Sequence, residues 1–381
     1  MKRVLHLFAN WRWTGPAEPA VNLARALMSH GWDVTFACGR PPAYGENSVV
    51  DKAREQGLPI LAGLKLHKHI NPYWNYPDGW RLRRVLTSQH FDLLHCHLRN
   101  AHIVAALAAR PIPDRPFVVR SSYAGEGPKG YWERRLITEF TDGLIVVSER
   151  ARRNVVEKLG FPPERVRLVH TAVDLERFDP GRGLGDRRTE LGLPPHAFVV
   201  GIVARIQPRR RFHVFLEAIA QAHRQFPSLR ALIVGRGTHM EHVATRPVRQ
   251  MGLSDVVLFP GYHTGDAYVQ TLASMDVKVF LVPGTDGSCR AAREAMAMGL
   301  PVVAARRGML PELVADGQRG LVVDHGPKPL AEAILKLAHD QELRAQMGAA
   351  ARQYALEHFS LDRQGEAVGA LYTDLLEAGH A

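Results

Sequence analysis

Residues 283–294 read PGTDGSCRAARE and continue as AMAMGLPVVA over 295–304. An apolar run at 277–282 precedes them, so the pattern predicts a strand, a glycine-containing turn, a helix over 290–298 and a strand over 301–304. A strand, a helix and a second strand form the repeating unit of a parallel sheet covered by helices. This stretch therefore predicts an α/β fold.

The same unit recurs along the whole chain. In the first half, apolar runs predict strands at 4–9, 33–38, 91–97, 116–120, 143–148 and 165–169, and amphipathic patterns predict helices at 21–30, 103–109, 131–140 and 149–159. In the second half, the same signals predict strands at 198–203, 229–234, 256–259, 277–282 and 301–304, and helices at 212–225, 265–274, 290–298, 328–338, 341–356 and 361–378. We therefore predict two doubly wound α/β halves, with a ligand outside the carboxyl ends of the strands.

Residues 180–195 are rich in glycine, proline and charge, which is typical of a linker between domains. We predict an N-terminal domain over 1–180 and a C-terminal domain over 181–358. We predict a C-terminal helix over 359–381 that crosses back to the first domain.

Composition excludes several classes of protein. The chain has 381 residues, of which 46% are hydrophobic and 23% are charged, so it can bury a large core and is not disordered throughout. Its 3 cysteines are too few and too scattered for a disulfide framework or a four-cysteine zinc site. The N-terminus lacks a signal-peptide pattern, and no window approaches about 18 apolar residues. We therefore expect a cytoplasmic protein.

The positive charge is concentrated in the first half of the chain. The net charge is +11, and residues 1–180 carry 26 Lys and Arg against 18 Asp and Glu, which is +8. A basic half favours an anionic partner such as a nucleotide or a phosphorylated lipid. The alternative is a solvated surface whose arginines recognise nothing.

Residues 283–294 bring together groups suited to a nucleotide sugar. Glycines at a helix start allow an anion to approach free backbone N–H groups, and Arg290 adds a cation. The carboxylates of Asp286 and Glu294 suit the hydroxyls of a sugar or ribose. In the alternative interpretation, Asp286 only caps the helix and Glu294 is a surface residue.

A second group of arginines lies in VARIQPRRRF (203–212), between a strand and a helix. Arg205 and Arg210 belong to it. Arginines at the carboxyl end of a strand can clamp a phosphate, because guanidinium binds oxyanions with two donors. An arginine run can equally be a solvated face.

The sequence offers little support for a metal. His95 and His97 would face the same side of one strand and could bind zinc, but the sequence indicates no third ligand. A packed or hydrogen-bonded pair is favoured, and no Asp-x-Asp motif occurs. The aromatic residues in loops of the first half indicate either contacts with an acceptor sugar or packing: Trp11, Trp13, Tyr73, Trp74 and Tyr76.

The segment 286–314 resembles the signature region of family 4 glycosyltransferases, which are retaining enzymes of the GT-B fold. Asp286-x7-Glu294 stands where the family has Glu-x7-Glu, and AMAMGLPVVA and Pro311-Glu312 follow in family order. Further segments in family order are 21–36, 147–160, 171–180, 200–212, 231–237 and 358–372. The resemblance implies two Rossmann-like domains that face each other across a cleft. It makes 1–180 the acceptor-side domain and 181–358 the nucleotide-sugar-binding domain.

The resemblance also implies roles for residues on the donor side. Arg205 and Arg210, the latter at the place of a family lysine, would hold the donor diphosphate. Asp286 would contact the transferred sugar, and Glu294 would hold the ribose. The remaining donor-binding positions implied by the family are Gly15, Gly287, Ser288, Cys289 and Arg290.

On the acceptor side, the family commonly has a histidine after the strand at 116–120, and here Ser122 occupies that place. Arg120 and His97 are the neighbouring candidates for acceptor-side contacts. Arg120 could substitute in part for the charge of that histidine.

The resemblance implies a retaining, metal-independent transfer of a sugar from a UDP- or GDP-sugar to a glycan or lipid-linked acceptor, in surface polysaccharide or lipopolysaccharide synthesis. No cofactor is expected. We expect peripheral contact with the inner, anionic face of the membrane and no nucleic acid partner. The alternatives are a nucleotide-sugar-binding protein without transferase activity and a glycosidase-like pair formed by Asp286 and Glu294.

Overall fold

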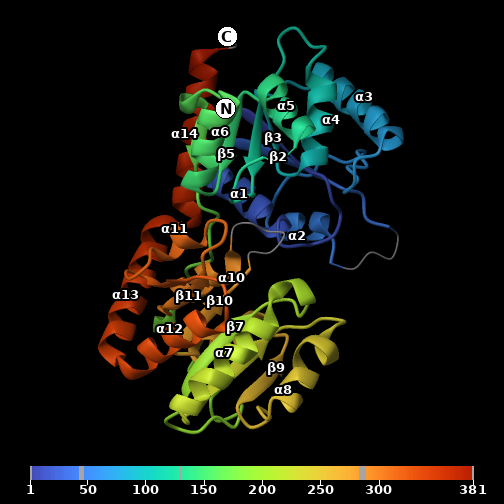
Figure 1. Ribbon diagram of the computed structural model, residues 1–381. Helices are drawn as coiled ribbons and strands as arrows, with labels where there is room; N and C mark the ends of the chain where they lie inside the picture. The colour runs from blue at the N-terminus through green and yellow to red at the C-terminus, as the bar shows by residue number, and fades with distance from the viewer. Residues whose placement is uncertain (1, 43–46, 129, 283–288, 380–381) are drawn as a thin grey trace. The chain divides into compact units, whose positions relative to one another are not determined.

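The computed structural model describes residues 2–42, 47–128, 130–282 and 289–379, which fall into two compact units (Figure 1). Of the described residues, unit 1 contains those within 2–172 and 361–379, and unit 2 contains 173–282 and 289–360. Each unit has a parallel sheet covered by helices. The predicted α/β fold is therefore confirmed, whereas the domain boundaries at 180 and 358 stay predictions.

Within the described residues, unit 1 has a six-stranded parallel sheet in the order β2-β1-β3-β4-β5-β6. Its strands are β1 (Arg3–Phe8), β2 (Asp33–Cys38), β3 (Leu93–Cys96), β4 (Phe117–Ser122), β5 (Gly143–Val146) and β6 (Val166–Leu168). Its helices are α1 (Ala17–Ser29), α2 (Val49–Glu55), α3 (Pro72–Ser88), α4 (Arg99–Ala109), α5 (Tyr131–Phe140), α6 (Glu149–Leu159), η1 (Pro163–Arg165) and α14 (Leu361–Ala378). The strand order reverses at β1, as in doubly wound folds.

The sheet of unit 2, again within the described residues, has the order β12-β11-β10-β7-β8-β9, which is the Rossmann order. Its strands are β7 (Phe198–Val203), β8 (Leu229–Val234), β9 (Val257–Gly261), β10 (Val277–Phe280), β11 (Val302–Ala305) and β12 (Gly320–Val323). Its longer helices are α7 (Phe212–Gln225), α9 (Gly265–Ala273), α10 (Arg290–Ala297), α12 (Pro327–His339) and α13 (Gln341–His358). Its short helices are η2 (Pro180–Arg182), η3 (Pro208–Arg210), η4 (Glu241–Thr245), α8 (Arg246–Gln250) and α11 (Leu310–Val314).

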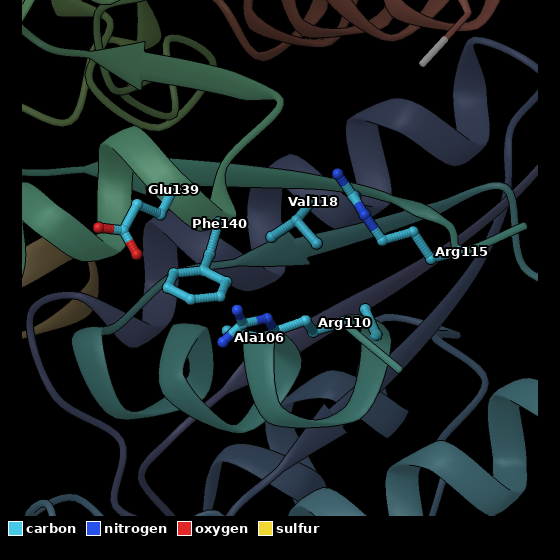
Figure 2. A pocket seen from close by; sticks show the side chains of 7 residues that line it. Ala106, Arg110, Arg115, Val118, Glu139 and Phe140 are labelled. Carbon is cyan, nitrogen blue, oxygen red and sulfur yellow. The ribbon is translucent and has the colours of Figure 1, made fainter. Parts of the chain in front are cut away.

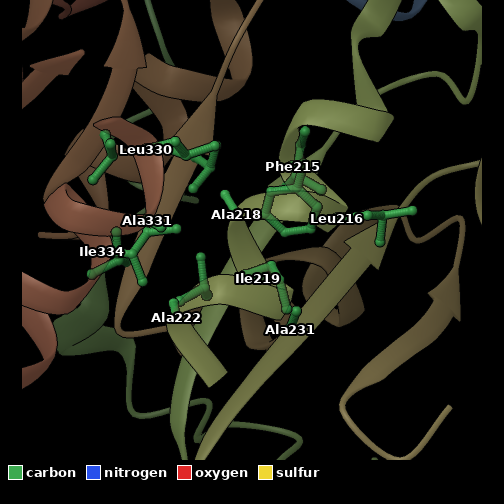
Figure 3. Close-up of a cluster of buried hydrophobic side chains, with 14 of the residues drawn as sticks. Phe215, Leu216, Ala218, Ile219, Ala222, Ala231, Leu330, Ala331 and Ile334 are labelled. Atoms are coloured by element: carbon green, nitrogen blue, oxygen red, sulfur yellow. The ribbon is translucent and has the colours of Figure 1, made fainter. Parts of the chain in front are cut away.

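One face of the unit 2 sheet is covered by an apolar core. Figure 3 shows Phe215 and Ile219 of α7 beside Leu330 and Ile334 of α12, and all four side chains are buried. Val277 and Val279 of β10 belong to the same core. Because side chains alternate along a strand, Lys278 between these two valines points to the opposite face of the sheet.

In unit 1, the C-terminal helix α14 packs against α1. Two glycines of α14 allow the helices to approach closely, since a Cβ at Gly365 would lie 2.7 Å from the His30 ring and one at Gly369 would lie 3.0 Å from Trp32 Nε1. The approach brings the buried Tyr372 ring edge-on to Trp32, with ring centroids 5.0 Å apart. The last helix of the chain is thus part of the core of unit 1.

The sequence missed two helices of unit 1, α2 and α3. The latter contains Pro77 and four aromatic residues, which weaken the apolar periodicity. Most of the other elements begin and end within two residues of their predicted bounds. No helix in the described part of the chain is long and apolar enough to cross a membrane.

Candidate functional site

The arginine loop after β7 lies at the carboxyl edge of the unit 2 sheet. Arg205 is exposed in this loop. Arg210 is half-buried, and its Nη1 donates a hydrogen bond of 2.8 Å to the backbone oxygen of Val282, just beyond β10. Burial lowers the pKa of the Arg210 guanidinium, and the charge of Arg209 lowers it further. The structure therefore places one of the two predicted diphosphate cations at the exit of the strand that leads toward α10.

Two glycines fix the path of this loop. A Cβ at Gly235 would lie 2.1 Å from the backbone oxygen of Ala204, and one at Gly237 would lie 2.1 Å from that of Ile206. The Ile206 N–H donates to the Arg236 oxygen, which links the two segments. Only glycine lets the segment after β8 approach the Arg205 loop so closely. The sequence GRG (235–237), directly after a strand, carries the signal for this close approach.

Glu294 is buried in α10 and both of its carboxylate oxygens are occupied. Oε1 accepts a hydrogen bond of 2.7 Å from Arg290 Nε, and Oε2 accepts one of 2.8 Å from the Tyr268 hydroxyl of α9. Glu294 is only 3% exposed, so the alternative interpretation of it as a surface residue is wrong. The carboxylate is instead held at a fixed position by a cation and a phenol.

Lys278 of β10 lies beside this carboxylate and was not singled out in the sequence. Its side chain is fully buried, and its Nζ has no hydrogen-bond partner among the described residues. Burial lowers the pKa of Lys278 well below its usual value, while the charge of Glu294 raises it. The sequence does show a lysine inside an apolar strand, which is unusual. It does not show that this lysine lies near Glu294.

Several predicted donor-binding positions lie around the start of α10. Asp286, Gly287 and Ser288 lie outside the described residues, so their roles stay predictions. Cys289 is buried with a φ of 53°, and α10 begins at Arg290. The positive end of the α10 dipole therefore lies at Arg290, and its role in holding a diphosphate stays a prediction.

In unit 1, the predicted acceptor-side residues also gather at a carboxyl edge. His97 follows β3, and Arg120 and Ser122 lie within the last three residues of β4. All three side chains are buried. Arg120 Nη1 donates to the Cys96 oxygen at 3.2 Å, and burial lowers the pKa of Arg120. Gly15 is exposed in the turn that precedes α1.

The histidine pair has a third neighbour, His6 of β1. β1 and β3 are paired with His6 opposite His95, and the ring nitrogens of His6, His95 and His97 lie within 4.8 Å of one another. The sequence indicates no third ligand for the pair, but the structure places His6 within reach as one. The sequence missed His6 because strand pairing, and not chain spacing, brings it there.

Hydrogen bonds link these three imidazoles to hydroxyl groups. His6 and His97 share a hydrogen bond of 2.9 Å, His97 bonds the Tyr123 hydroxyl at 2.9 Å, and His95 bonds the Tyr372 hydroxyl of α14. The other ring nitrogen of His95 bonds the Ser121 hydroxyl at 2.7 Å. We call this the imidazole cluster.

The imidazole cluster is electrically neutral. Burial lowers the pKa of His6 to about 3 and the pKa values of His95 and His97 well below the usual range. Neutral imidazoles can bind a transition metal, but the charge of Arg120 acts on His95 and His97 and would repel a cation. The predicted hydrogen-bonded arrangement therefore accounts for these residues better than a metal site.

A pocket of about 370 Å³ in unit 1 lies away from all of these residues (Figure 2). It is lined by the ends of α4 and α5 and by Val118 near the start of β4, with Arg110, Arg115 and Glu139 around it. The start of β4 is at the opposite edge of the sheet from Ser122. None of the predicted site residues lines this pocket.

Comparison with known proteins identifies two families along the chain. Residues 15–177 match the model of Glycosyltransferase Family 4, and residues 186–354 match that of Glycosyl transferases group 1. A D-inositol 3-phosphate glycosyltransferase of Streptomyces bingchenggensis is 31% identical over 75% of this chain and 67% of its own length. The protein of the same name from Corynebacterium jeikeium is 31% identical over 87% of this chain and 77% of its own.

Solved structures share the fold. The HepE protein of Anabaena, in a crystal structure with UDP, has a TM-score of 0.82 at 20% identity and covers 98% of this chain and 100% of its own. A glycosyltransferase of Rickettsia africae has a TM-score of 0.82 at 14% identity, over 99% of this chain and 100% of its own. With the two family matches and the relatives above, these likenesses show that the chain belongs to the group 1, family 4 glycosyltransferases of the GT-B fold.

Proposed function

We propose that this glycosyltransferase takes its sugar from a UDP-sugar and transfers it with retention of the anomeric configuration. The observation that carries this proposal is the Arg210 guanidinium, which is tied to Val282 at the exit of β10, the strand that leads toward α10. A cation beside a helix N-terminus is suited to the negative charge that grows on a departing diphosphate. Arg205, in the same loop, supplies the second cation.

Glu294 is proposed to hold the ribose. Its carboxylate is anchored by Tyr268 and Arg290, so it is already oriented before the nucleotide arrives. Asp286 is proposed to contact the transferred sugar. This division of roles argues against the glycosidase-like alternative, because arginines that neutralise a diphosphate have no task in the hydrolysis of a glycoside.

The identity of the nucleotide is proposed from the neighbours. HepE of Anabaena has been crystallised with UDP, with UDP and glucose, and with UDP-glucose. Its likeness to this chain is in the fold. UDP-sugars are therefore the first donors to test, followed by GDP-sugars.

For the acceptor, we propose a glycan or a lipid-linked glycan of a surface polysaccharide or lipopolysaccharide. The basic first half of the chain, with +8 over residues 1–180 (26 − 18), favours an anionic acceptor. A second candidate is an inositol phosphate, favoured by the relatives named D-inositol 3-phosphate glycosyltransferases. Both acceptors offer a hydroxyl next to negative charge.

We further propose that transfer needs neither a metal nor another cofactor, because the arginines supply the positive charge that a metal would otherwise provide. A cytoplasmic location is proposed because the three cysteines are buried and none of them forms a disulfide.

The test is a donor screen with the purified protein, in which release of nucleoside diphosphate is measured with and without acceptor. We expect UDP release with one of the UDP-sugars, unchanged after chelator treatment, and an α-linked product from an α-linked donor. Loss of activity with chelator and recovery with a divalent ion would refute the metal-independent proposal. Binding of UDP-sugars without turnover under any condition would favour the binding protein.

A further inference from the structure

Helix α3 presents aromatic side chains to solvent. Tyr73 is 76% exposed, Tyr76 is 66% exposed and Trp80 is 60% exposed. Residues three and seven positions apart lie on the same face of a helix, so these rings form a single stripe. A helix that packs on a sheet usually turns such residues inward, and a contiguous exposed group of them marks a contact surface.

The inner face of α3 is fixed, so the stripe cannot turn inward. The Asp78 carboxylate accepts hydrogen bonds of 3.0 and 2.7 Å from the backbone N–H groups of Lys65 and Leu66. Asn75 donates to the Asn100 side chain of α4 at 2.6 Å. These buried polar contacts orient the helix with its aromatic stripe outward.

Helix α5 adds two aromatic residues to the same region of unit 1. Tyr131 is 67% exposed and Trp132 is 68% exposed, in the first turn of α5. Both α3 and α5 contact α4, and the three helices lie side by side in Figure 1. Each precedes a strand of the parallel sheet, so the N-termini of α3 and α5 lie toward the carboxyl edge, where His97 and Ser122 are found.

Cations surround the stripe. Residues 65–84 contain five basic residues, Lys65, Lys68, Arg81, Arg83 and Arg84, against one acidic residue, the buried Asp78. The Arg84 guanidinium lies over the Trp80 ring, 4.9 Å from its centroid. Surfaces that lie at the headgroup level of an anionic bilayer typically combine exposed tyrosine and tryptophan with arginine and lysine.

We propose that this aromatic–basic face, made of Tyr73, Tyr76, Trp80, Arg83 and Arg84 of α3 with Tyr131 and Trp132 of α5, docks unit 1 on an anionic lipid membrane. Charge complementarity selects the lipid, and the rings insert between its headgroups. The inference rests on the proposed function in one respect. It uses the proposed lipid-linked acceptor, which the membrane would deliver to the carboxyl edge of unit 1. Single-stranded nucleic acid, which also binds aromatic and basic groups, is the competing partner that the test must exclude.

The test is flotation of the full chain with two kinds of vesicle, phosphatidylcholine alone and phosphatidylcholine mixed with an equal part of phosphatidylglycerol. We expect binding to the anionic vesicles only. Each cation at an anionic surface contributes a factor of about five, so Arg83→Glu/Arg84→Glu should weaken binding by at least about 25-fold. Tyr73→Ser/Trp80→Ser should weaken it by about tenfold, because less apolar area enters the interface.

Matched controls place the same changes elsewhere on the surface. Tyr262→Ser removes an aromatic residue that is 55% exposed in unit 2, and Arg25→Glu/Arg224→Glu reverses two exposed arginines outside the face. Both controls should float like the wild type. Equal flotation of the face variants and the controls, absence of wild-type flotation, or tighter binding to an oligonucleotide than to vesicles would each overturn the proposal. Since flotation needs no nucleotide sugar, its result is independent of the donor screen.

Discussion

The carboxyl edges of the two sheets differ in the charge of the side chains that line them. In unit 1, the edge is built mainly from imidazoles that burial keeps neutral and from the hydroxyl groups of Ser121 and Tyr123, with one buried cation, Arg120, beside them. In unit 2, the edge carries the Arg205 and Arg210 guanidiniums and the Glu294 carboxylate, which accepts hydrogen bonds from Arg290 and Tyr268.

This difference suggests which substrate part each edge can receive. Fixed cations at a helix start suit a diphosphate, whereas neutral hydrogen-bonding groups suit sugar hydroxyls. The two edges also differ in their expected response to pH and to mutation. Unit 1 should respond to protons, and unit 2 should respond to the loss of individual charges.

The largest expected effect concerns the charged edge. Arg210→Ala should lower the transfer rate by about 100- to 1000-fold, because a cation that meets developing diphosphate charge contributes about 2.7–4 kcal/mol. The fold should survive, since Arg210 is only half-buried and belongs to no apolar core. Steady-state kinetics with circular dichroism checks both parts. Arg224→Ala, an exposed arginine of α7, is the control and should keep full activity.

The second effect concerns the imidazole cluster of unit 1. The pKa of His6 is lowered to about 3 by burial, so below pH 6.5 the unfolded chain binds a proton that the folded chain does not. The free energy of unfolding of unit 1 should therefore fall as pH falls from 6.5 toward 3, by about 1.4 kcal/mol per pH unit for each such histidine.

Hydrogen exchange of the full chain at pH 7 and pH 5, corrected for intrinsic rates, measures this loss. Peptides from β1 and β3 should lose more protection than those from β7 and β8, because the described part of unit 2 contains no fully buried histidine and the lowered pKa values of His263 and His325 belong to partly buried or exposed side chains. Equal losses in both sheets would contradict the account. His6→Asn should reduce the acid sensitivity of β1.

The third effect concerns the loop that carries Arg205. Gly237→Ala should weaken UDP binding by roughly tenfold, because the new methyl group would displace the Ile206 backbone. Gly252→Ala is the control: Gly252 has a φ of 67° and open space around it, so the change should cost about 1 kcal/mol of stability without altering UDP affinity. Calorimetry on both variants distinguishes displacement of the loop from general destabilisation.

The smallest effect concerns the support of Glu294. Tyr268→Phe removes one hydrogen bond to the carboxylate and keeps the ring, so the KM for the donor should rise by about fivefold while kcat changes little. An unchanged KM would mean that Tyr268 only packs. Glu294→Gln, which keeps the shape but not the charge, should weaken donor binding more than Tyr268→Phe does.

Much of the fold could be predicted because its strands are continuous apolar runs. The runs FVVGIV (198–203) and LRALIV (229–234) coincide with β7 and β8. Helix α3 could not be predicted, because its aromatic residues face solvent and Pro77 interrupts its pattern. Periodicity detects burial, and α3 buries little of its apolar surface.

Only those residues of the candidate site that lie in contiguous sequence motifs could be predicted. Arg210 and Glu294 belong to contiguous motifs and were found there. His6 and Tyr268 reach their partners through strand pairing and helix packing, and Lys278 comes near Glu294 in the same way, so the sequence alone did not bring these residues together with the site.

The central claim is that the carboxyl edge of unit 2 binds a nucleoside diphosphate, and titration calorimetry of wild type and Arg210→Ala with UDP, GDP, ADP and CDP tests it most directly. The account predicts that the wild type binds UDP most tightly and that Arg210→Ala weakens UDP binding by at least about tenfold. Absence of binding by any of the four at millimolar concentration, or equal affinity in the two proteins, would contradict it.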